Sequence, residues 1–171
     1  MTDNAALTAE HMVHPTRLGD LTIVRDGNAL TGLYFPHHWY RPAAASLGLE
    51  TDRGFDAVRR QLDEYLAGTR TAFELPLKAR GSGLQRRVWE LIAAVPYAQT
   101  ATYGELARRM GGTTAREVGA AVGRNPLSIL IPCHRIVGSN GKLTGYAGGL
   151  RRKRLLLDLE QQTAGAAAGL W

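Results

Sequence analysis

A succession of three helix starts between residues 82 and 117 constrains the fold of this chain more than any other feature of its sequence. In each, a hydroxyl residue is followed three positions later by Glu or Gln, which is the capping-box pattern. The pairs are Ser82 with Gln85, Thr102 with Glu105, and Thr114 with Glu117. Pro96 ends the first helix, and Gly111 and Gly112 separate the second from the third. Helix, tight glycine turn, helix is typical of a helix-turn-helix, so we predict a mainly helical C-terminal domain over residues 83–160.

The first half of the chain has the pattern of a small α/β domain, which we place at residues 16–77. Residues 21–25 and 29–35 flank the turn sequence Asp26-Gly27-Asn28 and predict a β-hairpin. Apolar residues at helical spacing predict a helix over 56–67, and alternation at 73–77 predicts a strand. The fold class is therefore α+β.

The remaining segments lack apolar periodicity. Residues 78–82 are predicted to be a linker between the two domains. Residues 1–15 and the Ala/Gly-rich residues 161–171 are predicted to be a flexible N-terminus and a flexible tail.

The charge of the chain is divided unevenly between its halves. Residues 1–77 carry seven Lys and Arg against ten Asp and Glu, a net charge of −3, whereas residues 78–171 carry fourteen against five, a net charge of +9. A cationic surface attracts polyanions, so a nucleic acid is the favoured partner. Charge alone fits a basic surface without a specific partner equally well.

Cys133 is the only cysteine, and it lies beside His134 in the motif of residues 131–137, IPCHRIV. A lone cysteine is usually a small core residue, but a thiol becomes a nucleophile when a base or cation is close. Neighbours in a strand point to opposite faces, so contact between Cys133 and His134 needs a turn, which Pro132 favours, or a bridging water. We interpret Cys133 as a candidate nucleophile.

A single cysteine excludes an internal disulfide, a thiol relay and a zinc site built on several cysteines. The sequence contains no apolar run long enough to span a membrane and no signal-sequence pattern. We expect a cytoplasmic protein with no membrane partner, no cofactor and no metal site.

The second helix of the predicted pair, residues 115–123, consists mostly of small residues. Small side chains allow close approach of the helix backbone, which favours a shallow fit in the minor groove, with Arg116 and Arg124 as charged contacts. A core helix packed through Gly119 and Ala120 explains the same composition equally well.

Three segments together resemble the O6-alkylguanine-DNA alkyltransferase family: residues 131–137, residues 123–126 (GRNP) and residues 145–149 (GYAGG). The resemblance extends from about residue 82 to residue 160, and the order of elements in the first half is consistent with the family's N-terminal domain. It implies a helix-turn-helix domain that carries the active-site cysteine loop.

The resemblance also implies the catalytic residues. Cys133 corresponds to the alkyl acceptor, His134 to a base that acts through a water, and Glu160 to the carboxylate that orients the histidine. Asn125 corresponds to the asparagine that braces the cysteine loop, and Tyr103 to the tyrosine that helps rotate the target phosphate and hydrogen-bonds the flipped guanine.

Two further sets of residues follow from the resemblance. Arg116 corresponds to the arginine that fills the gap left by the flipped base. The expected DNA contacts are Thr102, Tyr103, Ala115, Arg116, Gly119, Ala120, Arg124 and Ser139. The expected pocket residues are Pro132, Ile136, Tyr146, Ala147 and Gly148. Some relatives have serine in place of Ala147, so here only backbone N–H groups are expected to donate to the guanine oxygen.

The implied function is direct reversal of DNA damage. The family transfers the alkyl group of O6-alkylguanine, and of O4-alkylthymine, from double-stranded DNA bound through the minor groove to its cysteine. A thioether product leaves no route back to the thiol, so we expect one turnover per molecule. The resemblance also implies a monomer that can cluster on DNA.

A Cys-His-Glu hydrolase is the rival enzyme, but it explains neither the helix pair nor the charge division. A lesion sensor without catalysis is the rival binding protein, and the presence of Cys133 argues against it.

Overall fold

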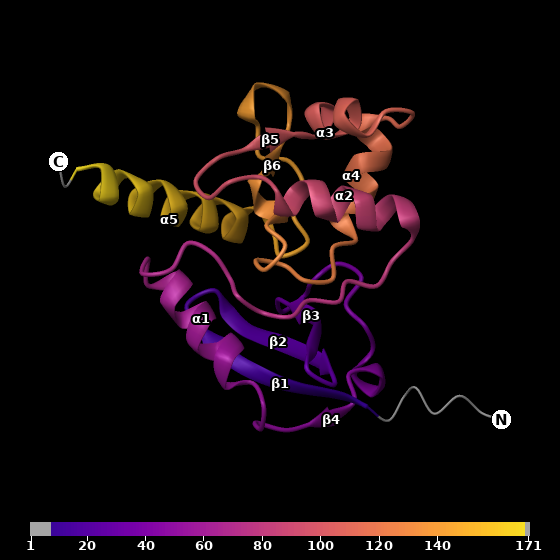
Figure 1. Ribbon diagram of the computed structural model, residues 1–171, viewed down its shortest axis with the longest axis vertical. Coiled ribbons are helices and arrows are strands. Elements are labelled where there is room, and N and C mark those ends of the chain that lie inside the picture. The colour runs from indigo at the N-terminus through magenta and orange to yellow at the C-terminus, as the bar shows by residue number, and fades with distance from the viewer. Residues whose placement is uncertain (1–7, 170–171) are drawn as a thin grey trace.

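The computed structural model describes residues 8–169, in which a small sheet lies below a group of helices (Figure 1). The N-terminal half holds a four-stranded sheet of order β3-β2-β1-β4, with α1 lying across it. The bounds in this half are β1 Ala9–Thr16, β2 Gly19–Asp26, β3 Ala29–Tyr34, β4 Leu49–Glu50 and α1 Asp56–Leu66. The bounds in the other half are α2 Gly83–Ala93, β5 Ala101–Thr102, α3 Tyr103–Met110, α4 Ala115–Gly123, β6 Ile136–Val137 and α5 Leu150–Ala168. A four-stranded sheet in one half and mainly helices in the other agree with the predicted α+β fold class.

The predicted hairpin is β2 and β3, which pair antiparallel around the turn at residues 27–28. β1 occupies most of the segment that we predicted to be a flexible N-terminus, so that prediction is wrong for residues 9–15; residues 1–7 lie outside the described part. Only Met12 of β1 is buried, which is why no apolar alternation marks this strand. Its backbone pairing with β2 along its whole length holds it instead.

The strand predicted at residues 73–77 does not form. This segment makes only an isolated bridge between Leu77 and Leu30, with hydrogen bonds from Leu30 N to Pro76 O and from Lys78 N to Leu30 O, both 2.8 Å. Pro76 has no N–H group to donate and therefore interrupts a ladder.

The three helices predicted from capping boxes are all present. In each of α2, α3 and α4, the hydroxyl accepts from the backbone N–H three residues on, and the Gln or Glu side chain accepts from the N-cap N–H. These caps satisfy N–H groups that a helix start otherwise leaves unpaired.

The predicted flexible tail is wrong for residues 161–168, because α5 continues to Ala168. Gln and Ala are good helix formers, and the Gln161 side chain donates to Ala98 O at 2.7 Å. Residues 170–171 lie outside the described part.

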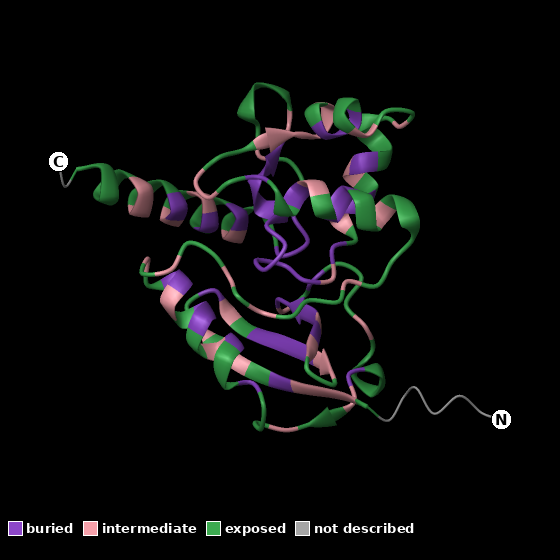
Figure 2. Cartoon of the chain, in the orientation of Figure 1, coloured by how far each residue is buried: buried purple, intermediate pink, exposed green. Residues whose placement is uncertain are grey.

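One hydrophobic core joins the two halves. Buried residues concentrate where the sheet meets the helices (Figure 2), and a single cluster includes Leu33 of β3, Leu62 of α1, Ile92 of α2 and Leu156 of α5. Leu33 N also donates to Pro126 O at 2.8 Å, next to the loop that precedes Cys133. Within residues 8–169, no helix is long and apolar enough to cross a membrane.

Candidate active site and DNA-facing surface

Cys133 begins a short 3-10 turn, Cys133–Arg135, that follows Pro132. A turn at this position is what the sequence analysis required after Pro132. Cys133 is only 3% exposed and lies in a cavity of about 40 Å³. Burial raises the pKa of the Cys133 thiol, while the positive charge of Lys153 opposes that rise. The thiol therefore needs a nearby base to become a nucleophile.

His134 and Glu160 form the relay expected beside this cysteine. His134 Nε2 lies 2.6 Å from Glu160 Oε2, and both side chains are fully buried. If Nε2 carries the proton toward the carboxylate, Nδ1 is left as an acceptor, and Nδ1 makes no hydrogen bond within the described residues. Burial lowers the pKa of His134 and outweighs the opposing effect of Glu160. The imidazole is therefore neutral near pH 7 and able to take a proton.

Arg135 neutralises the buried carboxylate. Its Nε donates to Glu160 Oε1 at 2.8 Å and its Nη2 to Oε2 at 3.0 Å, while Nη1 donates to Val95 O at 2.8 Å. Burial alone would raise the pKa of Glu160, but the hydrogen bonds from His134 and Arg135 lower it to about 2. Glu160 is thus an anion that holds His134 in one orientation.

Asn125 makes side-chain hydrogen bonds to the loop that precedes Cys133. Its Nδ2 donates to Ile131 O at 2.8 Å, and its Oδ1 accepts from Leu127 N at 3.0 Å. These bonds close the loop of residues 127–132 that delivers Cys133 to the cavity. The Asn125 side chain therefore stabilises the conformation of this loop, which is the role expected for it.

The cavity contains only part of the predicted pocket. Tyr146 and Ala147 line it together with Cys133 and Tyr103, whereas Pro132, Ile136 and Gly148 are buried but do not line it. Gly148 packs so closely against the Phe35 ring that a side chain there would overlap it. The lining residues outside the predicted pocket set are Trp39, Gly119, Val122, Gly123 and Gly145, of which Gly119 was predicted as a DNA contact.

Lys153 is a fully buried residue that the sequence analysis missed. Its Nζ donates to the carbonyls of Ile136 at 2.5 Å, Thr144 at 2.9 Å and Gly145 at 3.2 Å. Burial lowers the pKa of Lys153 to about 8. Lys153 thereby connects α5 to the loop of residues 144–145 beside the cavity. The sequence gave no indication of this role, because Lys153 is one of several basic residues in a helix.

A second, larger hollow lies over the helix pair. It measures about 650 Å³ and is lined by Thr102, Tyr103, Gly104, Arg108, Ala115, Arg116, Gly119, Ser139 and Asn140. Six of the eight predicted DNA contacts are in this set; Ala120 and Arg124 are exposed but lie outside it. The guanidinium of Arg124 instead stacks 3.6 Å from the Tyr40 ring centroid. Tyr103 and Gly119 line both the hollow and the cysteine cavity, so the two adjoin.

The sequence left two explanations for the small residues of α4, which were packing into the core and close approach to DNA. Val118, Ala121 and Val122 are buried, so the helix does pack into the core, but not through Gly119 and Ala120. Its other face presents Ala115 and Arg116 to solvent. The small residues Ala115 and Ala120 are exposed, and the fit of this helix to the minor groove stays a prediction.

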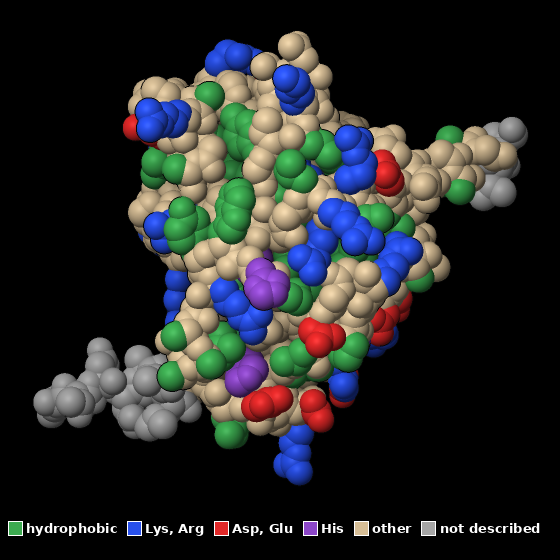
Figure 3. All heavy atoms as spheres, turned by 180° about the vertical axis from the view of Figure 1, so that it is seen from behind, with side chains coloured by type: hydrophobic (Ala, Val, Ile, Leu, Met, Phe, Trp, Pro, Cys, Tyr) green, Lys and Arg blue, Asp and Glu red, His purple; other side chains and the backbone are tan. Residues whose placement is uncertain are grey.

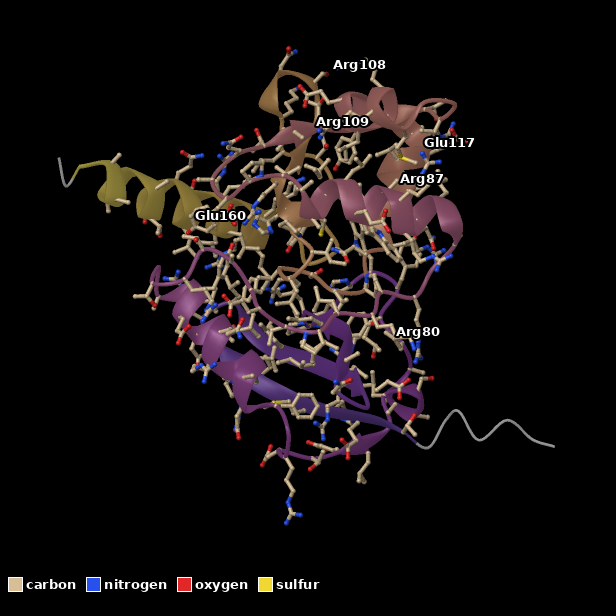
Figure 4. All side chains as sticks on the ribbon, in the orientation of Figure 1. Arg80, Arg87, Arg108, Arg109, Glu117 and Glu160 are labelled. Carbon is tan, nitrogen blue, oxygen red and sulfur yellow. The ribbon has the colours of Figure 1, made fainter. Side chains whose placement is uncertain are left out.

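The charge division predicted from the sequence is visible on the surface. In Figure 3, most of the acidic side chains lie over the lower half, which is the N-terminal half, while Lys and Arg predominate above it. Figure 4 shows Arg108 of α3 at the outer edge of the helical half, Arg109 of the same helix on the side toward β5, and Glu160 on α5. Among residues 8–169, no group of three His, Cys, Asp or Glu side chains is arranged to hold a metal ion.

Comparison with known proteins agrees with this arrangement. Residues 11–79 match the 6-O-methylguanine DNA methyltransferase, ribonuclease-like domain, and residues 83–162 match the 6-O-methylguanine DNA methyltransferase, DNA binding domain. The chain belongs to the 6-O-methylguanine DNA methyltransferase family.

Similar proteins cover almost the whole chain. The methylated-DNA–protein-cysteine methyltransferase of Mycobacterium tuberculosis (strain ATCC 25618 / H37Rv) is 43% identical over 151 residues, which are 87% of this chain and 90% of the relative. That of Mycolicibacterium paratuberculosis is 41% identical over 163 residues, 95% and 98% of the two chains. The crystal structure of Mycobacterium tuberculosis OGT in complex with DNA matches with a TM-score of 0.84 and 39% identity, over 90% of this chain and 94% of that one.

Proposed function

We propose that this protein repairs DNA directly by transferring the alkyl group of O6-alkylguanine to Cys133. The observation that carries the proposal is the position of Cys133, which lines a cavity adjoining the hollow of the helix pair. The next residue in the chain, His134, forms a buried pair with Glu160. The relatives are named methylated-DNA–protein-cysteine methyltransferases, and one is described in complex with DNA. O4-alkylthymine, whose alkyl oxygen has the same chemistry, is the second substrate that we propose.

The substrate base must leave the DNA stack to react. The alkyl group lies on a base edge inside the duplex, where a thiol that is 3% exposed cannot reach it. We infer that α4 binds the minor groove through its small residues, that Arg116 fills the gap in the stack, and that the flipped base passes Tyr103 and Gly119 to reach the cysteine. We propose that one protein molecule repairs one lesion as a monomer, and that bound molecules can cluster along DNA.

The chemical step is a displacement at saturated carbon. The Cys133 proton moves through a water to His134 Nδ1, the sulfur forms a bond to the alkyl carbon, and the bond from that carbon to O6 breaks. The departing guanine takes up a proton, which we propose comes from the Tyr103 hydroxyl, a group that donates to Thr144 O at 3.2 Å in the structure. The proton taken by His134 then passes back through water to Tyr103, so that the step balances. Burial raises the pKa of Tyr103, so this hydroxyl remains a donor.

The product explains why each molecule reacts once. A thioether has no carbonyl for water to attack, and the chain contains no second cysteine to displace the alkyl group. With Ala147 in the pocket, the guanine oxygen is held by backbone N–H groups. We place the reaction in the cytoplasm, where a lone thiol stays reduced.

Intact-mass spectrometry after mixing the protein with a duplex that carries one O6-methylguanine tests the proposal. We expect a gain of one CH2, limited to one per chain and located on Cys133 by peptide mapping. Loss of the lesion without a change in mass would identify a turning-over enzyme, and a bound but unchanged lesion would identify a sensor. Cys133→Ser is the matched control, which should bind the lesion and transfer nothing.

A further inference from the structure

Helix α1 of the N-terminal half reaches the catalytic carboxylate through Tyr65. This residue is fully buried, and its hydroxyl donates to Glu160 Oε2 at 2.5 Å. The same oxygen lies 2.6 Å from His134 Nε2, and the hydroxyl is 3.4 Å from that nitrogen. Tyr65 and His134 thus meet at one carboxylate oxygen.

The two oxygens of Glu160 have different partners. Oε1 accepts from Arg135 Nε at 2.8 Å and from Ala98 N at 3.0 Å. Oε2 accepts from Tyr65, from His134 and from Arg135 Nη2 at 3.0 Å. Burial and the adjacent Glu160 charge raise the pKa of Tyr65, so its hydroxyl stays protonated and donates at any working pH. Among the described residues, the Tyr65 hydroxyl is the side-chain donor that the N-terminal half contributes to Glu160 Oε2, and it is uncharged.

We propose that Tyr65 is a positioning residue for the reaction of Cys133: its hydroxyl fixes Glu160 Oε2 and disperses its negative charge, and thereby sets the orientation and basicity of His134. The inference rests on the proposed alkyl transfer and gives the N-terminal half a part in it. A hydrogen bond from Tyr65 makes Oε2 a weaker partner for an imidazolium, which favours the neutral imidazole that accepts the thiol proton.

The direction of the effect follows from the groups around His134. Burial lowers the pKa of His134, Glu160 raises it, and Arg135 and Lys153 lower it further. Removing the Tyr65 hydroxyl leaves these groups in place but concentrates the negative charge of Glu160 on Oε2. Because a more negative Oε2 stabilises the protonated imidazole, we expect the pKa of His134 to rise. Since protonated His134 cannot act as the base, the acid limb of the rate profile moves to higher pH.

Tyr65→Phe tests this, with Tyr97→Phe as the matched control. The Tyr97 ring packs edge-on against Tyr65, with centroids 6.2 Å apart, and its buried hydroxyl has no hydrogen-bond partner within the described residues. The measurement is the single-turnover rate of alkyl transfer from an O6-methylguanine duplex across about pH 5 to 9, a range that brackets the ordinary histidine pKa. We expect the acid limb of Tyr65→Phe to move up by roughly one pH unit, the size of one lost hydrogen bond to a charged group, and that of Tyr97→Phe to stay in place.

A second variant keeps the test decisive if Tyr65→Phe folds poorly. Incorporation of 3-fluorotyrosine at position 65 retains the shape and strengthens the donor, so the acid limb should move to lower pH. Profiles that superimpose on the wild type in both variants, or an equal shift in Tyr97→Phe, would overturn the inference. A rate lowered equally at every pH would mark a purely structural role and overturn it too. Absence of transfer by the unmodified protein would instead refute the proposed function.

Discussion

The side-chain amide of Asn125 donates a hydrogen bond to the carbonyl of Ile131, 2.8 Å away, across the loop that delivers Cys133 to its cavity. Inside this loop Ile129 has a φ of 72°, a conformation that a β-branched residue rarely adopts. Such strain persists only where surrounding contacts fix it. The two hydrogen bonds of Asn125 to Ile131 and Leu127 provide that restraint, so the position of the thiol depends on a side chain that is not part of the proton relay.

Asn125→Ala should therefore lower both stability and activity. It leaves the carbonyl of Ile131 and the N–H of Leu127 without their buried partner, which costs roughly 2 to 5 kcal/mol of unfolding free energy. Urea denaturation measures the loss, and the single-turnover rate should fall under conditions where the variant is still folded. Asn28→Ala, exposed in the β2–β3 turn, is the control. Equal stabilities of the two variants would contradict the bracing role.

Glu160 predicts how stability responds to acid. Its pKa is lowered from 4.5 to about 2 in the folded protein, so the folded state binds fewer protons than the unfolded chain in this window. The stabilisation is fully present above the unfolded pKa and is lost as pH falls through about 2, a change on the order of 3 kcal/mol. Glu160→Gln should flatten the pH dependence of unfolding between those limits, whereas Asp158→Asn, exposed on the same helix, should retain it. An unchanged slope in Glu160→Gln would refute the assignment.

The sequence predicted those parts of the fold whose determinants are local. Capping boxes fix helix starts within a few residues, so α2, α3 and α4 were predicted from Ser82, Thr102 and Thr114. β1 was missed because pairing with β2 holds it rather than its own apolar pattern, and Pro76 broke the predicted strand at 73–77.

Some residues of the candidate site were predicted from the sequence, and others could be found only from the fold. The family resemblance, carried in part by the motif around Cys133, assigned the relay to Cys133, His134 and Glu160. Tyr65 lies on the apolar face of α1 with Val58 and Leu62, and helical spacing alone assigns such a residue to the core. Only the fold brings its hydroxyl to Glu160 and the Trp39 side chain to the cavity.

Arg116→Ala should weaken repair of duplex DNA without affecting the chemistry. Arg116 is exposed at the start of α4 and lines the hollow, but it does not line the cysteine cavity. We expect the rate on an O6-methylguanine duplex to fall roughly tenfold, as for one lost charged contact, and the rate with the free base O6-methylguanine to stay the same. Arg60→Ala, exposed on α1, is the charge-matched control. Equal losses on both substrates would place Arg116 in the chemical step instead.

Trp39 should limit the size of the alkyl group that the cavity accepts. The cavity of about 40 Å³ is lined by this ring, which packs against Gly123 and Gly145, while Trp39 N donates to Ala147 O at 3.2 Å. A space of that size has room for water but not for a guanine base, so we expect the wall to move when a flipped base enters.

Trp39→Ala removes the ring from this wall and should raise the rate with an O6-benzylguanine duplex relative to the O6-methyl duplex. Trp39→Phe should give an intermediate ratio. Trp39 is 49% exposed, so its truncation costs little stability, and thermal unfolding of each variant verifies this. Leu49→Ala, an exposed apolar residue on β4, is the control and should leave the ratio unchanged. Because the ratio compares two substrates on one protein, a general loss of activity cancels. An unchanged ratio across the Trp39 series would therefore contradict a role of this ring in limiting the size of the alkyl group.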